Sequence, residues 1–266
     1  MPTIKIGCAG WVYEDWIGPF YPDYVSKERF LTYYAKHFDI VEINSSHYNI
    51  PKEKTIKKWR ESVPHDFRFC IKFWNQITHI SDHRIGIQNL HIFLNAFQPL
   101  IEKIAYYLIQ FPPSFRYDRD NFIYIHEILD KIDPDIKVSV ELRHNTWFDL
   151  PNMKSLLNGK NQILGTIYLN DIIPYYPEWQ KNYYIRVIGD RNLKKFDRVQ
   201  RTIPEIWNDL TSFIKQNREN TKIDDIFVIF NNHYSGFSPA DSNMLKSFLD
   251  LPIKDFKKKG TITDFF

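Results

Sequence analysis

The chain alternates between short apolar runs and longer amphipathic segments. Eight runs of seven or eight residues are rich in β-branched and aromatic residues, and most are apolar almost throughout. This pattern is typical of strands that are covered on both faces, as in a parallel sheet. The predicted strands span residues 3–10, 40–46, 67–74, 105–111, 137–144, 164–170, 183–189 and 226–232.

Helical periodicity fills most of the intervals between these runs. Ser26 stands where the first helix should begin, and Ser238 followed by Pro239 marks the expected start of the last one. Residues 171–182 are rich in Pro and Tyr and predict little or no helix. The predicted helices span residues 26–38, 52–63, 85–104, 118–132, 152–159, 203–217 and 238–251.

Strands that alternate with helices in this way predict an α/β protein with a single (β/α)8 TIM-type barrel over residues 1–251. A doubly wound open sheet is the alternative. No GxGxxG motif follows the first run, which disfavours a dinucleotide-binding version of that sheet. The pattern stops near residue 251, so residues 252–266 are predicted to form a short, flexible, basic tail.

Composition narrows the class of protein. The 266 residues are 43% hydrophobic, as in globular proteins, and the 17% of aromatic residues favours an aromatic core or a face that stacks flat ligands. A net charge of +3 permits an anionic partner without requiring one. Cys8 and Cys70 lie in apolar runs, as buried thiols do in a reducing compartment. No apolar stretch approaches roughly eighteen residues and no signal peptide is recognisable, so we expect a cytoplasmic protein without a membrane partner.

Five charged residues interrupt the apolar strands. The active sites of such barrels lie at the carboxyl ends of the strands, and buried charges need partners. The five residues therefore predict either a polar pocket at the barrel mouth or a structural network of ion pairs. In a pocket, the two glutamates could act as general acid and base or bind metal, and the lysine could carry a proton or stabilise an anion. The candidate catalytic residues are Glu42, Lys72, Glu141, Arg143 and Arg186.

Histidines also fall near strand ends, at His47, His79, His144 and His233. No HxH, HExxH or CxxC spacing accompanies them, so the sequence leaves a divalent metal open and assigns no ligand set or other cofactor. No GxSxG motif occurs, and neither cysteine has an evident base nearby, which disfavours a hydrolase with a serine or cysteine nucleophile.

A basic stretch follows the seventh predicted strand. Loops at this position of such barrels often bind phosphate, and tryptophans near the same rim would suit stacked bases. The stretch therefore predicts a phosphate- or DNA-binding loop, with a solvated charged loop as the alternative. Its candidate residues are Arg191, Lys194, Lys195, Arg198 and Arg201, and the rim tryptophans are Trp11, Trp74 and Trp147.

Seven motifs in order resemble the YecE-like family, also called domain of unknown function 72. They are GCAGWVYEDWIGPFYP, FDIVEINSSHYNIP, RFCIKFWNQITH, LIQFPPSF, VELRHNTW, YIRVIGD and IFNNHYSGFSPADSNML, and they span about residues 4–250. The resemblance implies a TIM-type barrel and a shared pocket, but no established reaction. The implied pocket residues are Trp11, Tyr13, Glu42, Asn44, Tyr48, Lys72, His79, Gln110, Glu141, Arg143, Trp147, Arg186, Asn231 and Asn232.

A relationship between this family and endonuclease IV has been suggested, which would imply DNA binding, a role in DNA repair and phosphodiester hydrolysis. Endonuclease IV is rich in His, Asp and Glu zinc ligands at its barrel mouth. In this chain the matching places carry Lys72, Gln110, Arg143, Arg186 and Asn231. This departure argues against a trinuclear zinc mechanism.

The last eight residues, KGTITDFF, resemble the clamp-binding peptide called the PIP box. Ile262 falls on its aliphatic position, and Phe265 and Phe266 fall on its aromatic pair, so all three would share one face of a helical turn. Lys259 stands where the motif prefers Gln. The resemblance implies a PCNA-type sliding clamp as partner, and hence an archaeal source. The alternative is that the phenylalanines fold back onto the barrel.

The leading hypothesis is thus a DNA-binding barrel protein of DNA repair or replication that its tail tethers to a clamp, with a nuclease-like activity left open. The first alternative is an enzyme acting on a sugar or phosphorylated metabolite through the same pocket. The second is a DNA or clamp adaptor without enzymatic activity, in which the pocket charges only pair with one another.

Overall fold

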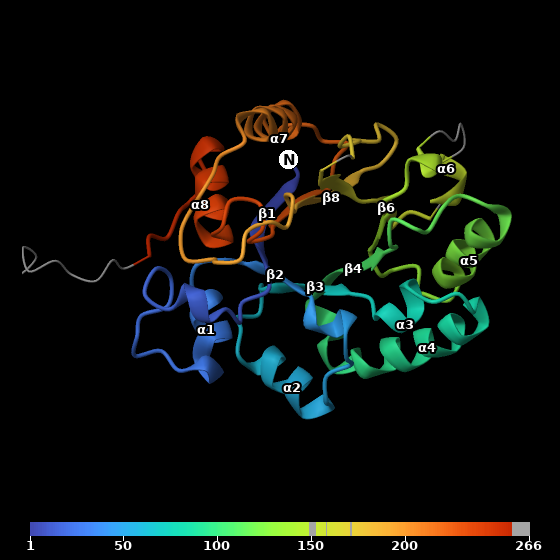
Figure 1. Cartoon of the computed structure of the whole chain (residues 1–266), viewed down its shortest axis with the longest axis horizontal. Helices are drawn as coiled ribbons and strands as arrows, with labels where there is room; N and C mark the ends of the chain where they lie inside the picture. Colours follow the sequence, from blue (N-terminus) through green and yellow to red (C-terminus); the bar gives the residue numbers. More distant parts are fainter. Residues whose placement is uncertain (149–152, 158, 171, 257–266) are drawn as a thin grey trace, which may run out of the picture.

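The structure, a computed structural model, describes residues 1–148, 153–157, 159–170 and 172–256 (Figure 1). Within them, nine strands pair in parallel in the order β6-β5-β4-β3-β2-β1-β9-β8-β7. Their bounds are Thr3–Ala9 (β1), Ile40–Ile43 (β2), Arg68–Lys72 (β3), Ile104–Gln110 (β4), Val138–Glu141 (β5), Gln162–Leu164 (β6), Thr166–Tyr168 (β7), Asn182–Val187 (β8) and Asp225–Phe230 (β9).

The two outermost strands of this order, β6 and β7, are consecutive in the chain and are separated only by Gly165. The amide of Gly165 donates to the carbonyl of Val140 at 2.9 Å, so the interrupted strand stays against β5. The sheet is therefore a nearly closed parallel barrel, and the predicted α/β class is confirmed. The structure has nine strands where eight runs were predicted, because the sixth run is divided at this glycine.

Helices surround the barrel (Figure 1). The α-helices are Phe30–Tyr34 (α1), Glu53–Glu61 (α2), Asn75–Thr78 (α3), His83–Ala96 (α4), Arg119–Asp130 (α5), Met153–Leu156 (α6), Pro204–Asn217 (α7) and Ser238–Phe248 (α8). The 3-10 helices are Glu14–Trp16 (η1), Lys27–Arg29 (η2), Ser45–His47 (η3), Gln98–Lys103 (η4) and Asn145–Trp147 (η5). No described helix is long and apolar enough to cross a membrane.

Two predicted helix starts differ from the structure. Ser26 precedes η2 but makes no side-chain capping hydrogen bond, and the α-helical part of that segment is only α1. Ser238 is already the first residue of α8. Its hydroxyl donates to Asn232 Oδ1 at 2.8 Å, because the chain leaving β9 brings that amide against the helix start.

The inside of the barrel is filled in layers, as strand alternation dictates. The lower layer is apolar and includes Cys70, Tyr106, Tyr184 and Phe227, with the rings of Tyr106 and Tyr184 5.3 Å apart. Nearer the carboxyl ends of the strands the inner side chains are polar and form the upper layer, at the mouth; on β3 and β8, Lys72 and Arg186 follow Cys70 and Tyr184 by two residues. That layer contains Glu42, Lys72, Gln110, Glu141 and Arg186.

Packing of the chain extends to Phe256, five residues past the expected end of the barrel domain. The Phe256 ring contacts the ring of Phe20 at 4.9 Å and also the ring of Phe237, and His37 Nδ1 lies 3.2 Å from the carbonyl oxygen of Lys254. The first part of the predicted tail thus lies against the region around α1. The predicted clamp-binding residues Lys259, Ile262, Phe265 and Phe266 lie outside the described residues.

Candidate functional site

Arg186 on β8 joins the two buried glutamates at the barrel mouth. Its Nε and Nη2 each donate to the carboxylate of Glu42 at 2.8 Å, and its Nη1 donates to Glu141. The hydroxyl of Tyr184 donates to Glu42 as well, at 2.7 Å. Both carboxylates are 0% exposed. The two-pronged contact with Glu42 is the strong form of an arginine–carboxylate pair, and the third bond ties Glu141 to the same guanidinium.

Glu141 has a second cationic partner in Arg143, which follows β5 and donates from Nε at 2.6 Å. Burial alone would raise the pKa of Glu141, but Arg143 and Arg186 together lower it to about 2. The general acid–base or metal-ligand role of the two glutamates stays a prediction. Their geometry favours a role as counter-ions that hold the arginines in place.

Lys72, at the end of β3, is the exception in this cluster. It is only 8% exposed, yet its side-chain amine has no hydrogen bond or ion pair with any described residue, although its backbone carbonyl accepts from the hydroxyl of Ser46 at 2.6 Å. Burial and the charge of Arg186 lower its pKa to about 7, against the partial opposition of Glu141 and Glu42. Among the described residues, the mouth therefore holds three buried cationic side chains and two buried carboxylates, a surplus of positive charge centred on Lys72 when its amine is protonated.

Arg143 also has a side-chain nitrogen without a hydrogen-bond acceptor among the described residues. Its Nη2 lies 2.5 Å from Glu141 Oε1, but off hydrogen-bonding geometry, and no described group accepts a hydrogen bond from this buried nitrogen. A buried guanidinium nitrogen without an acceptor is costly. Together with Lys72, it marks the mouth as a place that an anion would stabilise.

Two histidines flank Lys72 as neutral imidazoles. His47 Nδ1 lies 3.0 Å from the carbonyl oxygen of Phe73, so Nδ1 carries the proton and Nε2 is left as an acceptor. The rings of His47 and His79 are 4.8 Å apart. Burial, followed by the nearby charge of Lys72, lowers the pKa of each to about 4.

Histidines do not gather into a metal site in the described part of the chain. His144 Nδ1 contacts the hydroxyl of Thr146 at 2.9 Å, and the His233 ring lies against Phe196. Among the described residues, no group of three His, Cys, Asp or Glu side chains is arranged to hold a metal ion. The structure thus offers no ligand set for the metal that the sequence left open.

The predicted phosphate loop is divided between structural and free cations. Arg201 pairs with Asp190 and donates to the carbonyl of Tyr234 at 2.6 Å, so it ties the loop to the chain after β9. Arg198 is exposed, and its ion-pair partner among the described residues is its half-buried neighbour Asp197, at 3.4 Å. Arg191 has a backbone in the left-handed region, at φ 62°, and is exposed as a whole residue. Partial desolvation of its guanidinium, followed by the charges of Arg143 and Arg186, lowers its pKa. Lys194 and Lys195 are exposed.

Several predicted pocket residues have structural hydrogen bonds. Trp147 is buried and donates to the carbonyl of Phe115 at 2.7 Å, Gln110 donates to the carbonyl of Phe111, and Asn232 accepts from Ser238 at the start of α8. The Asn231 side chain accepts from the amide of His233, and Tyr13 donates to the carbonyl of Ala9. Tyr48 differs from these because its ring is 67% exposed beside the mouth, where Trp74 donates to its carbonyl oxygen.

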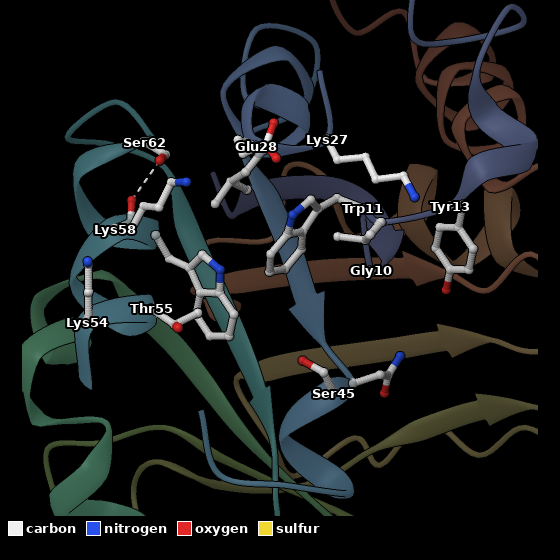
Figure 2. A pocket seen from close by; sticks show the side chains of 14 residues that line it. Gly10, Trp11, Tyr13, Lys27, Glu28, Ser45, Lys54, Thr55, Lys58 and Ser62 are labelled. Atoms are coloured by element: carbon white, nitrogen blue, oxygen red, sulfur yellow. Dashed lines mark hydrogen bonds between the residues drawn. The ribbon is translucent and has the colours of Figure 1, made fainter. Parts of the chain in front are cut away.

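A cleft of about 540 Å³ adjoins the mouth through Asn44 (Figure 2). It lies between the segment after β1, the segment around η2 and α1, and helix α2. The rings of Trp11 and Trp59 meet edge to face at 5.4 Å in its wall. Lys54 and Lys58, one helical turn apart on α2, also line it. Trp59, Lys54 and Lys58 were not among the predicted site residues, although Trp59 follows directly after paired lysines in the sequence.

Comparison with known proteins identifies the family. The model described as "Protein of unknown function DUF72" matches residues 5–263. The chain belongs to the DUF72 family. The UPF0759 protein YunF of Bacillus subtilis (strain 168) is 23% identical over 275 residues, covering 93% of this chain and 95% of that protein. The UPF0759 protein YecE of Escherichia coli (strain K12) is 31% identical over 155 residues, 58% of this chain and 54% of YecE.

Solved DUF72 structures share the fold. A DUF72 family protein from Thermotoga maritima MSB8 matches with a TM-score of 0.74 at 24% identity, over 93% of this chain and 99% of that one. Another from Enterococcus faecalis V583 matches with a TM-score of 0.75 at 24% identity, over 95% and 99%. These relatives are bacterial, so they lend no support to the archaeal source inferred from the tail. Their names state no activity.

Proposed function

We propose that this DUF72 protein binds DNA through phosphate groups at the barrel mouth, where Lys72, Arg143 and Arg191 receive them. The observation that carries the proposal is Lys72, a buried cation beside two arginines with no counter-ion among the described residues. A phosphate oxygen would supply the missing partner for its protonated amine and for Nη2 of Arg143.

The adjoining cleft favours a nucleic acid with unpaired bases. Proteins that bind single strands combine cations along the backbone with aromatic rings on which bases stack. The cleft offers Trp11 and Trp59 beside Lys54 and Lys58, and Tyr48 presents an exposed ring at the mouth. A strand with its phosphate at Lys72 would therefore find a ring-binding wall next to it. We propose single-stranded or locally unpaired DNA as the ligand, in a role in DNA repair or replication.

The direct test is fluorescence anisotropy of a labelled single-stranded oligonucleotide at several salt concentrations. We expect log K to fall by about 0.7 per log unit of salt for each phosphate contacted. Lys72→Met should weaken binding by about tenfold or more, since a charge-assisted hydrogen bond contributes about 1.5–3 kcal/mol. The matched control is Lys131→Met, an exposed lysine where α5 leads into β5, away from the mouth. Equal affinity of Lys72→Met and the wild type would refute the proposal.

A second candidate ligand is a phosphorylated metabolite. The ion pairs within the basic loop favour this ligand. Arg201 and Arg198 are paired with aspartates, so the loop has no continuous row of free cations along which a long nucleic-acid backbone could lie. In that case inorganic phosphate or a sugar phosphate should displace the oligonucleotide at comparable concentrations. The salt slope should then correspond to only one or two phosphates.

The clamp-binding tail is a separate proposal. The chain is anchored at Phe256, and the ten residues beyond it include the PIP-like group Ile262, Phe265 and Phe266. Binding to an immobilised PCNA-type clamp should be measured for the full chain and for a chain ending at Gly260. The tether proposal requires that only the full chain binds; equal binding would remove it. The DNA-binding measurement above does not depend on this outcome.

A further inference from the structure

Lys72 combines properties that the other charged groups of the cluster lack. The side chain is 8% exposed and its amine is unpaired among the described residues, while the nearby carboxylates of Glu42 and Glu141 are hydrogen-bonded to Arg186 and Arg143. The groups that act on it come from several elements. They are Arg186 on β8, Arg143 and Glu141 at β5, Glu42 on β2, and the neutral His47 and His79.

This environment favours the neutral amine. Two arginines stand beside it, and the two carboxylates cannot turn toward it without leaving Arg186 unpaired in the barrel interior. A lysine that is desolvated and placed next to other cations is the type that enzymes use as a nucleophile toward carbonyl carbon. The lowered pKa of Lys72, about 7, agrees with this placement.

The surrounding groups indicate the chemistry of a matching ligand. Arg143 Nη2 has no hydrogen-bond acceptor among the described residues, and Arg191 is exposed nearby, so a phosphate that pairs with protonated Lys72 could stay on these two arginines when the amine is neutral. His47 keeps Nε2 free to accept a proton because its Nδ1 donates to Phe73. An open-chain sugar phosphate would bring a phosphate to the arginines and a carbonyl carbon to the amine. The protein would supply the proton acceptor, at His47.

We propose that Lys72 Nζ forms a Schiff base with the carbonyl carbon of an open-chain sugar phosphate held at the barrel mouth. This inference rests on the proposed phosphate site. The carbonyl has two sources: the aldehyde of an abasic nucleotide in DNA, or a free sugar phosphate. Both carry the same aldehyde and phosphate groups, so the test separates them.

The step needs no oxidant or reductant. The nitrogen lone pair attacks the carbonyl carbon, the C–N bond forms, and the π electrons of C=O move to oxygen, which takes up a proton. A proton leaves the nitrogen; we assign His47 Nε2 as its acceptor, because His47 lies within the field of Lys72 and its Nδ1 already donates to Phe73, and the same proton then passes to the hydroxyl. The nitrogen lone pair then expels the hydroxyl as water after its protonation. The products are a protonated C=N bond and one water molecule.

Reductive trapping tests the inference. The full chain is incubated with sodium cyanoborohydride and either deoxyribose 5-phosphate or a single-stranded oligonucleotide with one abasic site, and the adduct is mapped by peptide mass spectrometry. We expect one dominant adduct at Lys72. Its rate should rise between about pH 6 and 8, whereas exposed lysines with a pKa near 10.4 should still be gaining reactivity far above that range.

Matched variants separate charge from nucleophilicity. Lys72→Arg keeps the cation and should retain oligonucleotide binding but lose the adduct, and Lys131→Met should keep both. An adduct only with the abasic strand identifies DNA as the source; an adduct with the free sugar phosphate identifies a metabolite. If the adducts are absent or spread evenly over exposed lysines while the oligonucleotide still binds, the inference is wrong and the proposed function stands. Mapping on the wild type makes the test independent of whether the variants fold.

Discussion

The two sides of the barrel mouth differ in how their charges are satisfied. On the side of β5 and β8, Glu141 and Arg186 share hydrogen bonds with each other and with further partners, and of these charged groups only Nη2 of Arg143 lacks an acceptor among the described residues. On the side of β3, Lys72 is almost as buried and has no partner among the described residues. The difference teaches that burial of a charge in a barrel does not by itself indicate chemistry. The unpaired group is the one that a ligand can use.

The largest loss of stability should come from removing Arg186, the cation shared by the two carboxylates on the paired side. Arg186→Leu would leave the carboxylates of Glu42 and Glu141 buried without their shared cation. Removing one partner of a buried pair costs about 3–5 kcal/mol. We expect a loss of this size in the free energy of unfolding, measured by urea denaturation. Arg198→Leu, at an exposed pair, is the control and should change stability by less than about 1 kcal/mol.

Replacing Lys72, on the unpaired side, should change the free energy of unfolding by less and in the opposite direction. The pKa of Lys72 is about 7 in the folded protein and 10.5 in its ordinary state, so between these values the unfolded chain binds more protons. Stability therefore rises with pH across that window, and the penalty is fully present below pH 7. Lys72→Met should be as stable as the wild type or more stable near pH 7, and its advantage should shrink toward pH 10. A variant that is destabilised at pH 7 by as much as Arg186→Leu would contradict the contrast between the two sides.

The smallest effect is expected on oligonucleotide affinity, when residues of the cleft beside the mouth are replaced. Trp59→Ala removes one of the two rings in its wall, and loss of one stacked base typically costs about 1–3 kcal/mol of binding. We expect weaker binding of a single-stranded oligonucleotide with an unchanged salt slope, because no cation is removed. Lys58→Ala should instead reduce the slope by about 0.7. Unchanged affinity in both variants would exclude the cleft from the binding surface.

Much of the barrel and its polar layer could be predicted from the sequence. Single charged residues inside otherwise apolar runs mark Glu42, Lys72, Glu141 and Arg186 as the residues of a polar layer at the strand ends, and strand alternation places each on one face of its strand. The divided sixth strand could not be predicted in the same way, because the break at Gly165 depends on how the last strands meet across the barrel.

The roles within the site were harder to predict, because they depend on contacts between distant segments. Arg186 pairs with both Glu42 and Glu141, which lie on strands far apart in the chain, and this leaves Lys72 as the cation without a partner among the described residues. Trp147 was expected at the rim but is buried, since it stacks on Phe115 from the preceding loop. Trp59 was overlooked because only the fold brings α2 against Trp11.

The most direct test of the account is a pH titration of Lys72 itself. In the full chain labelled at lysine side chains, the NMR signal assigned through Lys72→Arg would be followed from pH 5 to 11, with and without an oligonucleotide. We expect a midpoint near pH 7 that moves upward when the phosphates bind, because the anion stabilises the protonated amine. A midpoint near the ordinary value of 10.5, unmoved by the oligonucleotide, would contradict the assignment of Lys72 as the free cation of the site.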